Sequence, residues 1–185
     1  VREEILSAVP SNALSVCSAG ISDPADFLSD MKRYFRMAGN YQVFESGDAR
    51  LKDQLGSSPL SDLQSLMGDE VCRFMLDTDG GGSIARVAMV EISSRSGALD
   101  KLDEWAERYG SSGGDGGASL VDDYVLDPQT SFRIFHFPIE FYSGLFPGEI
   151  FMPYMAVFEN YLVLSDSRKA LERTIYQNVL HKTLS

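Results

Sequence analysis

The fold class of this chain is decided by two apolar runs, Val71-Cys-Arg-Phe-Met-Leu-Asp-Thr78 and Ile84-Ala-Arg-Val-Ala-Met-Val-Glu-Ile92. Asp79-Gly-Gly-Gly82 joins them, and glycine supplies the positive φ that a tight hairpin turn needs. The second run has apolar residues at both odd and even positions, which is typical of an inner strand covered on both sides. This stretch therefore predicts an antiparallel hairpin whose second strand lies inside a sheet.

Further strands and helices alternate along the rest of the chain. Glu159-Asn160 predicts a second hairpin turn. Strand-like runs occupy residues 13–19, 131–138, 152–158 and 161–165, with weaker ones at 41–45 and 121–126. Helices are predicted after Asp23-Pro24, after Ser58-Pro59, from about residue 97 to 109, and after Asp166. Because hairpins are frequent, we expect an α+β fold with a largely antiparallel sheet and with helices packed on one face.

One short pattern recurs three times. Ile21-Ser-Asp-Pro-Ala-Asp-Phe-Leu28 matches Ile92-Ser-Ser-Arg-Ser-Gly-Ala-Leu99 and Leu164-Ser-Asp-Ser-Arg-Lys-Ala-Leu171. Each copy reads as a strand end, a pair of residues that can cap N–H groups, and a helix with a buried Leu. A true repeat predicts three equivalent helices on one face of the sheet, whereas a chance similarity of strand-to-helix turns predicts nothing further.

Length and charge limit the classes of protein that fit. The chain has 185 residues, enough for a single α+β domain spanning residues 1–185, and a net charge of −11. This charge argues against binding to nucleic acid or to an anionic membrane surface. No apolar run is long enough for direct membrane insertion by this segment, and a start at Val1 suggests a fragment of a longer chain. Gly and Ser dominate residues 110–119, which predicts a flexible surface loop.

Two cysteines leave the redox compartment open. Cys72 lies on the apolar face of its strand, whereas Cys17 lies among small residues on the face opposite Leu14 and Val16. These different surroundings favour two free thiols, and a single Cys17–Cys72 disulfide is the alternative.

Few residues suggest catalytic or metal chemistry. Asp77-Thr-Asp79-Gly-Gly-Gly-Ser83 begins like a calcium loop, but Gly81 and Ala88 stand where ligands are needed, so a hairpin tip is the better interpretation. His136 follows Phe132 and Ile134 on one strand face, and Glu140 lies four residues further on. A histidine beside a carboxylate suits acid–base chemistry, but a hydrogen-bonded core or rim histidine is more common. No cofactor motif and no metal-ligand spacing occurs, so we expect no cofactor and no metal.

An aromatic stretch after His136 is the candidate binding surface. Aromatic residues alternate there with Pro and Gly, which suits a loop that contacts a protein or sugar partner, or one that folds back onto the core. The candidate ligand-binding residues are His136, Glu140, Phe141, Tyr142, Phe146 and Phe151.

Several segments resemble a bacterial family of unknown function found in membrane-anchored, extracytoplasmic proteins. They are Val9-Pro-Ser-Asn-Ala13, Leu66-Met-Gly-Asp-Glu-Val71, Glu159-Asn-Tyr-Leu-Val-Leu-Ser-Asp166, Ala170-Leu171 and Lys182-Thr-Leu-Ser185. The resemblance implies a location in the cell envelope or periplasm and a chain that continues beyond Ser185. It supplies no catalytic residue.

Three hypotheses about function follow. The first is a non-enzymatic envelope domain that binds another envelope protein, or the rest of its own chain, or serves as a structural module. The second is a hydrolase-like enzyme that uses His136 with carboxylates in a concave pocket. The third is a carrier of an apolar small molecule or lipid, with Phe and Met side chains lining a cavity between the sheet and the helices.

Overall fold

The structure is a computed structural model and describes residues 4–111, 119–137 and 152–184. Five α-helices, seven strands and a 3₁₀ helix lie in the described residues. In chain order they are η1 (Glu4–Ala8), β1 (Ser15–Gly20), α1 (Pro24–Met37), α2 (Tyr41–Leu55), α3 (Pro59–Leu66), β2 (Met67–Asp77), β3 (Ile84–Ile92), α4 (Arg95–Ser111), β4 (Val121–Asp127), β5 (Thr130–His136), β6 (Tyr154–Phe158), β7 (Tyr161–Ser165) and α5 (Arg168–Val179).

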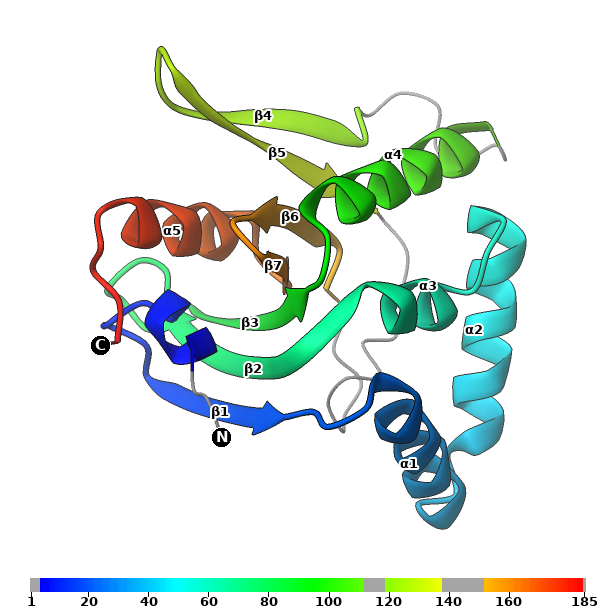
Figure 1. Ribbon diagram of the computed structural model, residues 1–185. Helices are drawn as coiled ribbons and strands as arrows, with labels where there is room; N and C mark the ends of the chain where they lie inside the picture. Colours follow the sequence, from blue (N-terminus) through cyan, green and yellow to red (C-terminus); the bar gives the residue numbers. More distant parts are fainter. Residues whose placement is uncertain (1–3, 112–118, 138–151, 185) are drawn as a thin grey trace.

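The seven strands form one sheet in the order β1-β2-β3-β7-β6-β5-β4. Every neighbouring pair is antiparallel, so the predicted α+β class with an antiparallel sheet is confirmed. Strand β1 lies at one margin of the sheet and β4 lies at the other (Figure 1).

The hairpin that decided the prediction has the expected geometry. Asp77 pairs with Ile84, and Gly80 and Gly82 both adopt positive φ in the turn. The second predicted hairpin joins β6 to β7, with Phe158 opposite Tyr161. Strand β3 lies between β2 and β7, which confirms that it is an inner strand.

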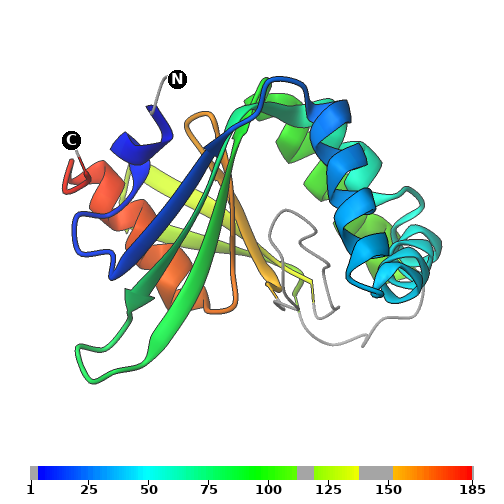
Figure 2. The same ribbon diagram turned by 90° about the horizontal axis from the view of Figure 1, so that it is seen from below.

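Both faces of the sheet are covered by helices. Ala88 and Val90 of β3 belong to the hydrophobic cluster that contains residues of α4, whereas Val87 and Met89 belong to the cluster that contains residues of α5. Figure 2 shows the sheet between α1–α4 on one side and η1 with α5 on the other. The expected packing on one face is thus replaced by packing on two, because the central strands are apolar on both faces and each face needs a cover.

The recurring turn is real as local structure only. Asp23 accepts a hydrogen bond from Ala25 N (2.7 Å) before α1, and Ser94 accepts one from Gly97 N (3.1 Å) before α4. In the third copy the cap is Ser167, which accepts from Ala170 N (3.3 Å). Since α4 and α5 cover opposite faces, the expected equivalence of the helices is wrong: the turns share capping chemistry, not a position in the fold.

Residues 41–45 were predicted as a weak strand, and this prediction is wrong. They begin α2, whose buried side of Phe44, Gly47, Leu51 and Leu55 has the spacing of three to four residues that a helix requires. The five-residue window showed alternation, but the pattern over the full segment is helical. Helix α2 ends at Gly56, which adopts φ +80°.

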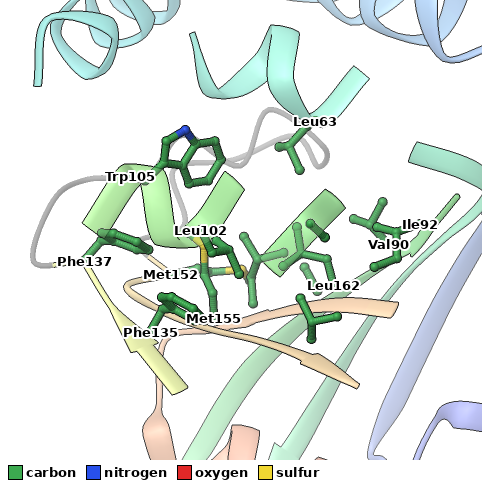
Figure 3. Close-up of a cluster of buried hydrophobic side chains, with 14 of the residues drawn as sticks. Leu63, Val90, Ile92, Leu102, Trp105, Phe135, Phe137, Met152, Met155 and Leu162 are labelled. Carbon is green, nitrogen blue, oxygen red and sulfur yellow. The ribbon is translucent and has the colours of Figure 1, made fainter. Parts of the chain in front are cut away.

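The core between the sheet and α4 is built around Trp105. Its ring meets Phe137 edge to face, and Phe137 stacks on Phe135, with ring centroids 6.3 and 6.2 Å apart. Met152 and Met155 fill the space beneath these rings (Figure 3). Helix α4 runs to Ser111, so the first two residues of the predicted 110–119 loop are helical, and 112–118 lie outside the described residues.

Candidate functional site

His136 is the one predicted site residue whose position is described. It ends β5, lies opposite Tyr154 of β6, and stacks its imidazole on the Tyr154 ring with centroids 4.6 Å apart. Its backbone N–H donates to Leu120 O (2.9 Å). Among the described carboxylates, none forms an ion pair or a hydrogen bond with this imidazole, so here it acts as a half-buried stacking residue.

The other five candidate residues lie outside the described residues. They are Glu140, Phe141, Tyr142, Phe146 and Phe151. The described part of the chain therefore brings no second member of the predicted aromatic site to His136.

The Asp77–Ser83 turn uses its carboxylate to hold its own backbone. Asp77 accepts hydrogen bonds from Asp79 N (3.1 Å), Gly80 N (2.8 Å) and Gly82 N (3.2 Å). These N–H groups, chiefly that of Asp79, keep the pKa of Asp77 below its ordinary value. Asp79 forms an ion pair with Lys169 of α5. The hairpin-tip interpretation accounts for both carboxylates.

A cavity of about 460 Å³ lies where β1, β2 and β3 meet η1. Its lining contains Glu4, Asp69, Glu70 and Glu91, together with Gly20, Ile21 and Ser22. The sequence did not reveal this grouping, because these carboxylates come from three separate parts of the chain and no local motif contains them.

Two of the cavity carboxylates are bound to backbone amides. Glu70, which is 6% exposed, accepts from Ile5 N (2.7 Å) and so fixes η1 to the sheet. Glu91 accepts from Asp69 N (2.8 Å) at the irregular part of β2. Burial, assisted by nearby carboxylates including Glu91 and Glu70, raises the pKa of Tyr161 to about 12. The observed contacts of these two carboxylates are structural.

The described residues contain no cluster of three or more His, Cys, Asp or Glu arranged to hold a metal ion. Within the same residues, no helix combines the length and the apolar character that crossing a membrane requires.

The two edges of the sheet differ in charge. Strand β4 carries Asp122, Asp123 and Asp127 in seven residues, and Asp122 pairs with Arg168 of α5 (2.6 Å). Charged side chains on an edge strand oppose pairing with another strand. The β4 edge is protected in this way.

Strand β1 has no such protection. All six of its residues are exposed, and the apolar side chains of Leu14 and Val16 are 58% and 37% exposed. The charge-free stretch that contains β1 runs from Ile5 to Ser22 in a chain whose net charge is −11. Proline is also absent from β1 itself. This is the feature of the described surface that best fits a binding site.

The backbone of β1 faces in two directions. Ile21 N donates to Asp69 O (2.6 Å), and alternation along an antiparallel pair then directs the N–H and C=O groups of Ala19 and Cys17 towards β2. The N–H and C=O groups of Val16, Ser18 and Gly20 point to the open side. These groups can form a ladder with an added strand.

The charge-free stretch was visible in the sequence as a signal. Its meaning was not, because strand order decides which strand is an edge, and strand order depends on long-range pairing.

The fold and the site define an α+β protein with a seven-stranded antiparallel sheet, one acidic edge and one uncharged edge. Comparisons with protein-family models, curated proteins and solved structures found no match.

Proposed function

We propose that this chain is a non-enzymatic protein-binding module that pairs the open edge of β1 with an extended segment of a partner. The observation that carries the proposal is the exposed and uncharged β1, beside a β4 edge with three aspartates. A peptide that adds a strand to a sheet gains main-chain hydrogen bonds, and alternate side chains give specificity.

The setting of this function is the bacterial cell envelope. This part of the proposal rests on the resemblance to membrane-anchored extracytoplasmic proteins. The partner is then another envelope protein or a further part of the same anchored chain. Fractionation of the host cells, with detection of the full-length protein, tests the location, and recovery in the cytoplasmic fraction would contradict it.

The binding proposal is tested with two matched edge variants. Val16→Glu puts a charge on the open edge, whereas Val125→Glu puts the same charge on β4, where the valine is 63% exposed. We expect the intact protein and the Val125→Glu variant to retain the same binding partner from host extracts. The Val16→Glu variant should lose it.

Circular dichroism and thermal unfolding check that both variants fold. Equal retention of the partner by the two folded variants would contradict the proposal. So would a retained partner that leaves the amide exchange of Val16, Ser18 and Gly20 unchanged.

A further inference from the structure

The open edge of β1 has a geometry that a second copy of itself satisfies. Its outward backbone groups belong to Val16, Ser18 and Gly20, which are alternate residues in one strand. Two such strands can pair antiparallel only in registers that match outward groups with outward groups. One of these registers places the twofold axis at Cys17, so that Val16 of one copy lies opposite Ser18 of the other.

From this geometry we infer that β1 pairs with β1 of a second copy around a twofold axis at Cys17. This inference rests on the proposed function and names its partner. The two sheets then join into one continuous antiparallel sheet. Pairing of this kind is isologous, so it closes at two copies.

The side chains favour the register centred on Cys17. In it Leu14, the most exposed apolar residue beside β1, lies opposite Gly20 of the other copy, which has no side chain to oppose it. A register shifted by one step along the axis, centred on Ser18, leaves Leu14 beyond the paired strand. Burial of an apolar side chain stabilises the first register over the second.

Charge also favours a second copy at this edge over any other part of the surface. Two chains of net charge −11 repel each other, but β1 itself contributes no charge to that repulsion. The nearest charged strand is β2, and in the dimer the two β2 strands are three strand spacings apart, about 14 Å. This exceeds the Debye length of about 8 Å at physiological salt, so the repulsion between them is largely screened.

The interface is small, so the expected association is weak. Six to eight residues of each copy take part, which places it with the small, transient interfaces. We expect a dissociation constant of roughly tens of micromolar or weaker, with a mass in solution that depends on protein concentration.

Cys17 reports the register directly. In the proposed dimer the two Cys17 residues form a non-hydrogen-bonded pair with Cα atoms about 4.5 Å apart. This lies within the range of about 4.4–6.8 Å that a disulfide spans. Oxidised glutathione supplies the oxidant for the test: two Cys17 thiols lose two protons and two electrons, and one oxidised glutathione becomes two molecules of glutathione.

The test compares the intact protein with a variant in which the thiol moves two residues along the same strand face, Cys17→Ser with Ala19→Cys. Both proteins are incubated with oxidised glutathione and read on non-reducing gels, and the mass in solution is measured by sedimentation. We expect a disulfide-linked dimer of the intact protein. The moved thiols face Ser15 of the other copy rather than each other, so cross-linking should fall at least tenfold.

Two results would overturn the inference. The first is a single-copy mass at every concentration up to about 1 mM, well above the expected dissociation constant. The second is a dimer in which both proteins cross-link equally or neither does, which would exclude the register at Cys17. If Val16→Glu still abolishes partner retention while the chain stays a single copy, the proposed function stands and this inference fails.

Discussion

At the scale of single residues, Trp105 holds together the helices that cover one face of the sheet. The side chain is 1% exposed, and its indole N–H donates to Asp62 Oδ2 (3.0 Å) at α3. Asp62 also lies 3.7 Å from Lys101 of α4. One carboxylate therefore links α3 to α4 through a buried donor and a charge.

Replacement of Asp62 by Ala should destabilise the fold by about 1–3 kcal/mol, because it leaves the buried indole N–H without this acceptor. The measurement is the free energy of unfolding in urea. Asp53→Ala, on the exposed side of α2, is the control and should change it by less than about 0.5 kcal/mol. Equal effects of the two substitutions would contradict the role of Asp62.

The two thiols should react at very different rates. Cys17 is exposed, whereas Cys72 is fully buried, and burial raises the pKa of Cys72 to about 12. A thiol reagent added to the native protein at low concentration should therefore label one cysteine, and the second should react only after unfolding. Mass spectrometry gives the count, and labelling of Cys72 in the native protein would show that β2 opens far more readily than its packing implies.

At the scale of elements, the irregular start of β2 depends on one glycine. A Cβ on Gly68 would lie 2.8 Å from a carboxylate oxygen of Glu91 and 2.9 Å from its Cγ and Cδ. The same carboxylate accepts the Asp69 N–H, so it cannot move away without loss of that bond. The register shift between Met67 and Val71 lies at this point.

Gly68→Ala should lower the free energy of unfolding by roughly 1–3 kcal/mol through this crowding. Gly81→Ala is the matched control, because no atom lies within 4 Å of its added Cβ. Chemical denaturation of both variants gives the comparison. A Gly68→Ala protein as stable as the control would mean that Glu91 is free to rearrange.

The elements that the sequence predicted well are those with local signals. The two hairpins have turn residues between apolar runs, and α1, α3 and α5 have caps or prolines at their starts. Helix α2 was missed because Asn40 makes no side-chain cap and Gly47 interrupts its pattern. Local chemistry is absent there, and packing against the neighbouring helices determines the helix instead.

The candidate site was predictable to a smaller extent. His136 is partly buried, as expected of a rim histidine, but its partner Tyr154 comes from another strand. The cavity of Glu4, Glu70 and Glu91 and the open edge of β1 both arise from pairing between distant segments. Such juxtapositions follow from strand order, which no short stretch of the sequence encodes.

At the scale of the whole molecule, stability should fall at alkaline pH. The pKa of Cys72 is raised from 9.0 to about 12, and that of Tyr161 from 10.0 to about 12, each chiefly by burial. Above pH 9 for the thiol, and above pH 10 for the phenol, the unfolded chain releases protons that the folded protein keeps. The folded state therefore keeps its full stability below these values and loses it as the pH rises towards 12.

Each group can contribute a loss of at most roughly 1.4 kcal/mol per pH unit in its window. Tyr161→Phe should flatten the decline of unfolding free energy between pH 10 and 12, and leave the earlier decline from pH 9 intact. Denaturation across this pH range measures both slopes. A variant that declines as steeply as the intact protein between pH 10 and 12 would contradict the burial of this phenol.

The central claim is that β1 is an open edge that pairs with another strand, and residue-resolved amide hydrogen exchange tests it most directly. At low protein concentration the amides of Val16 and Ser18 should exchange fast, and those of Cys17 and Ala19 slowly, because only the latter bond to β2. Raising the concentration, or adding a retained partner, should slow Val16 and Ser18 alone. If these two amides exchange equally fast under all of these conditions, β1 is not a binding edge.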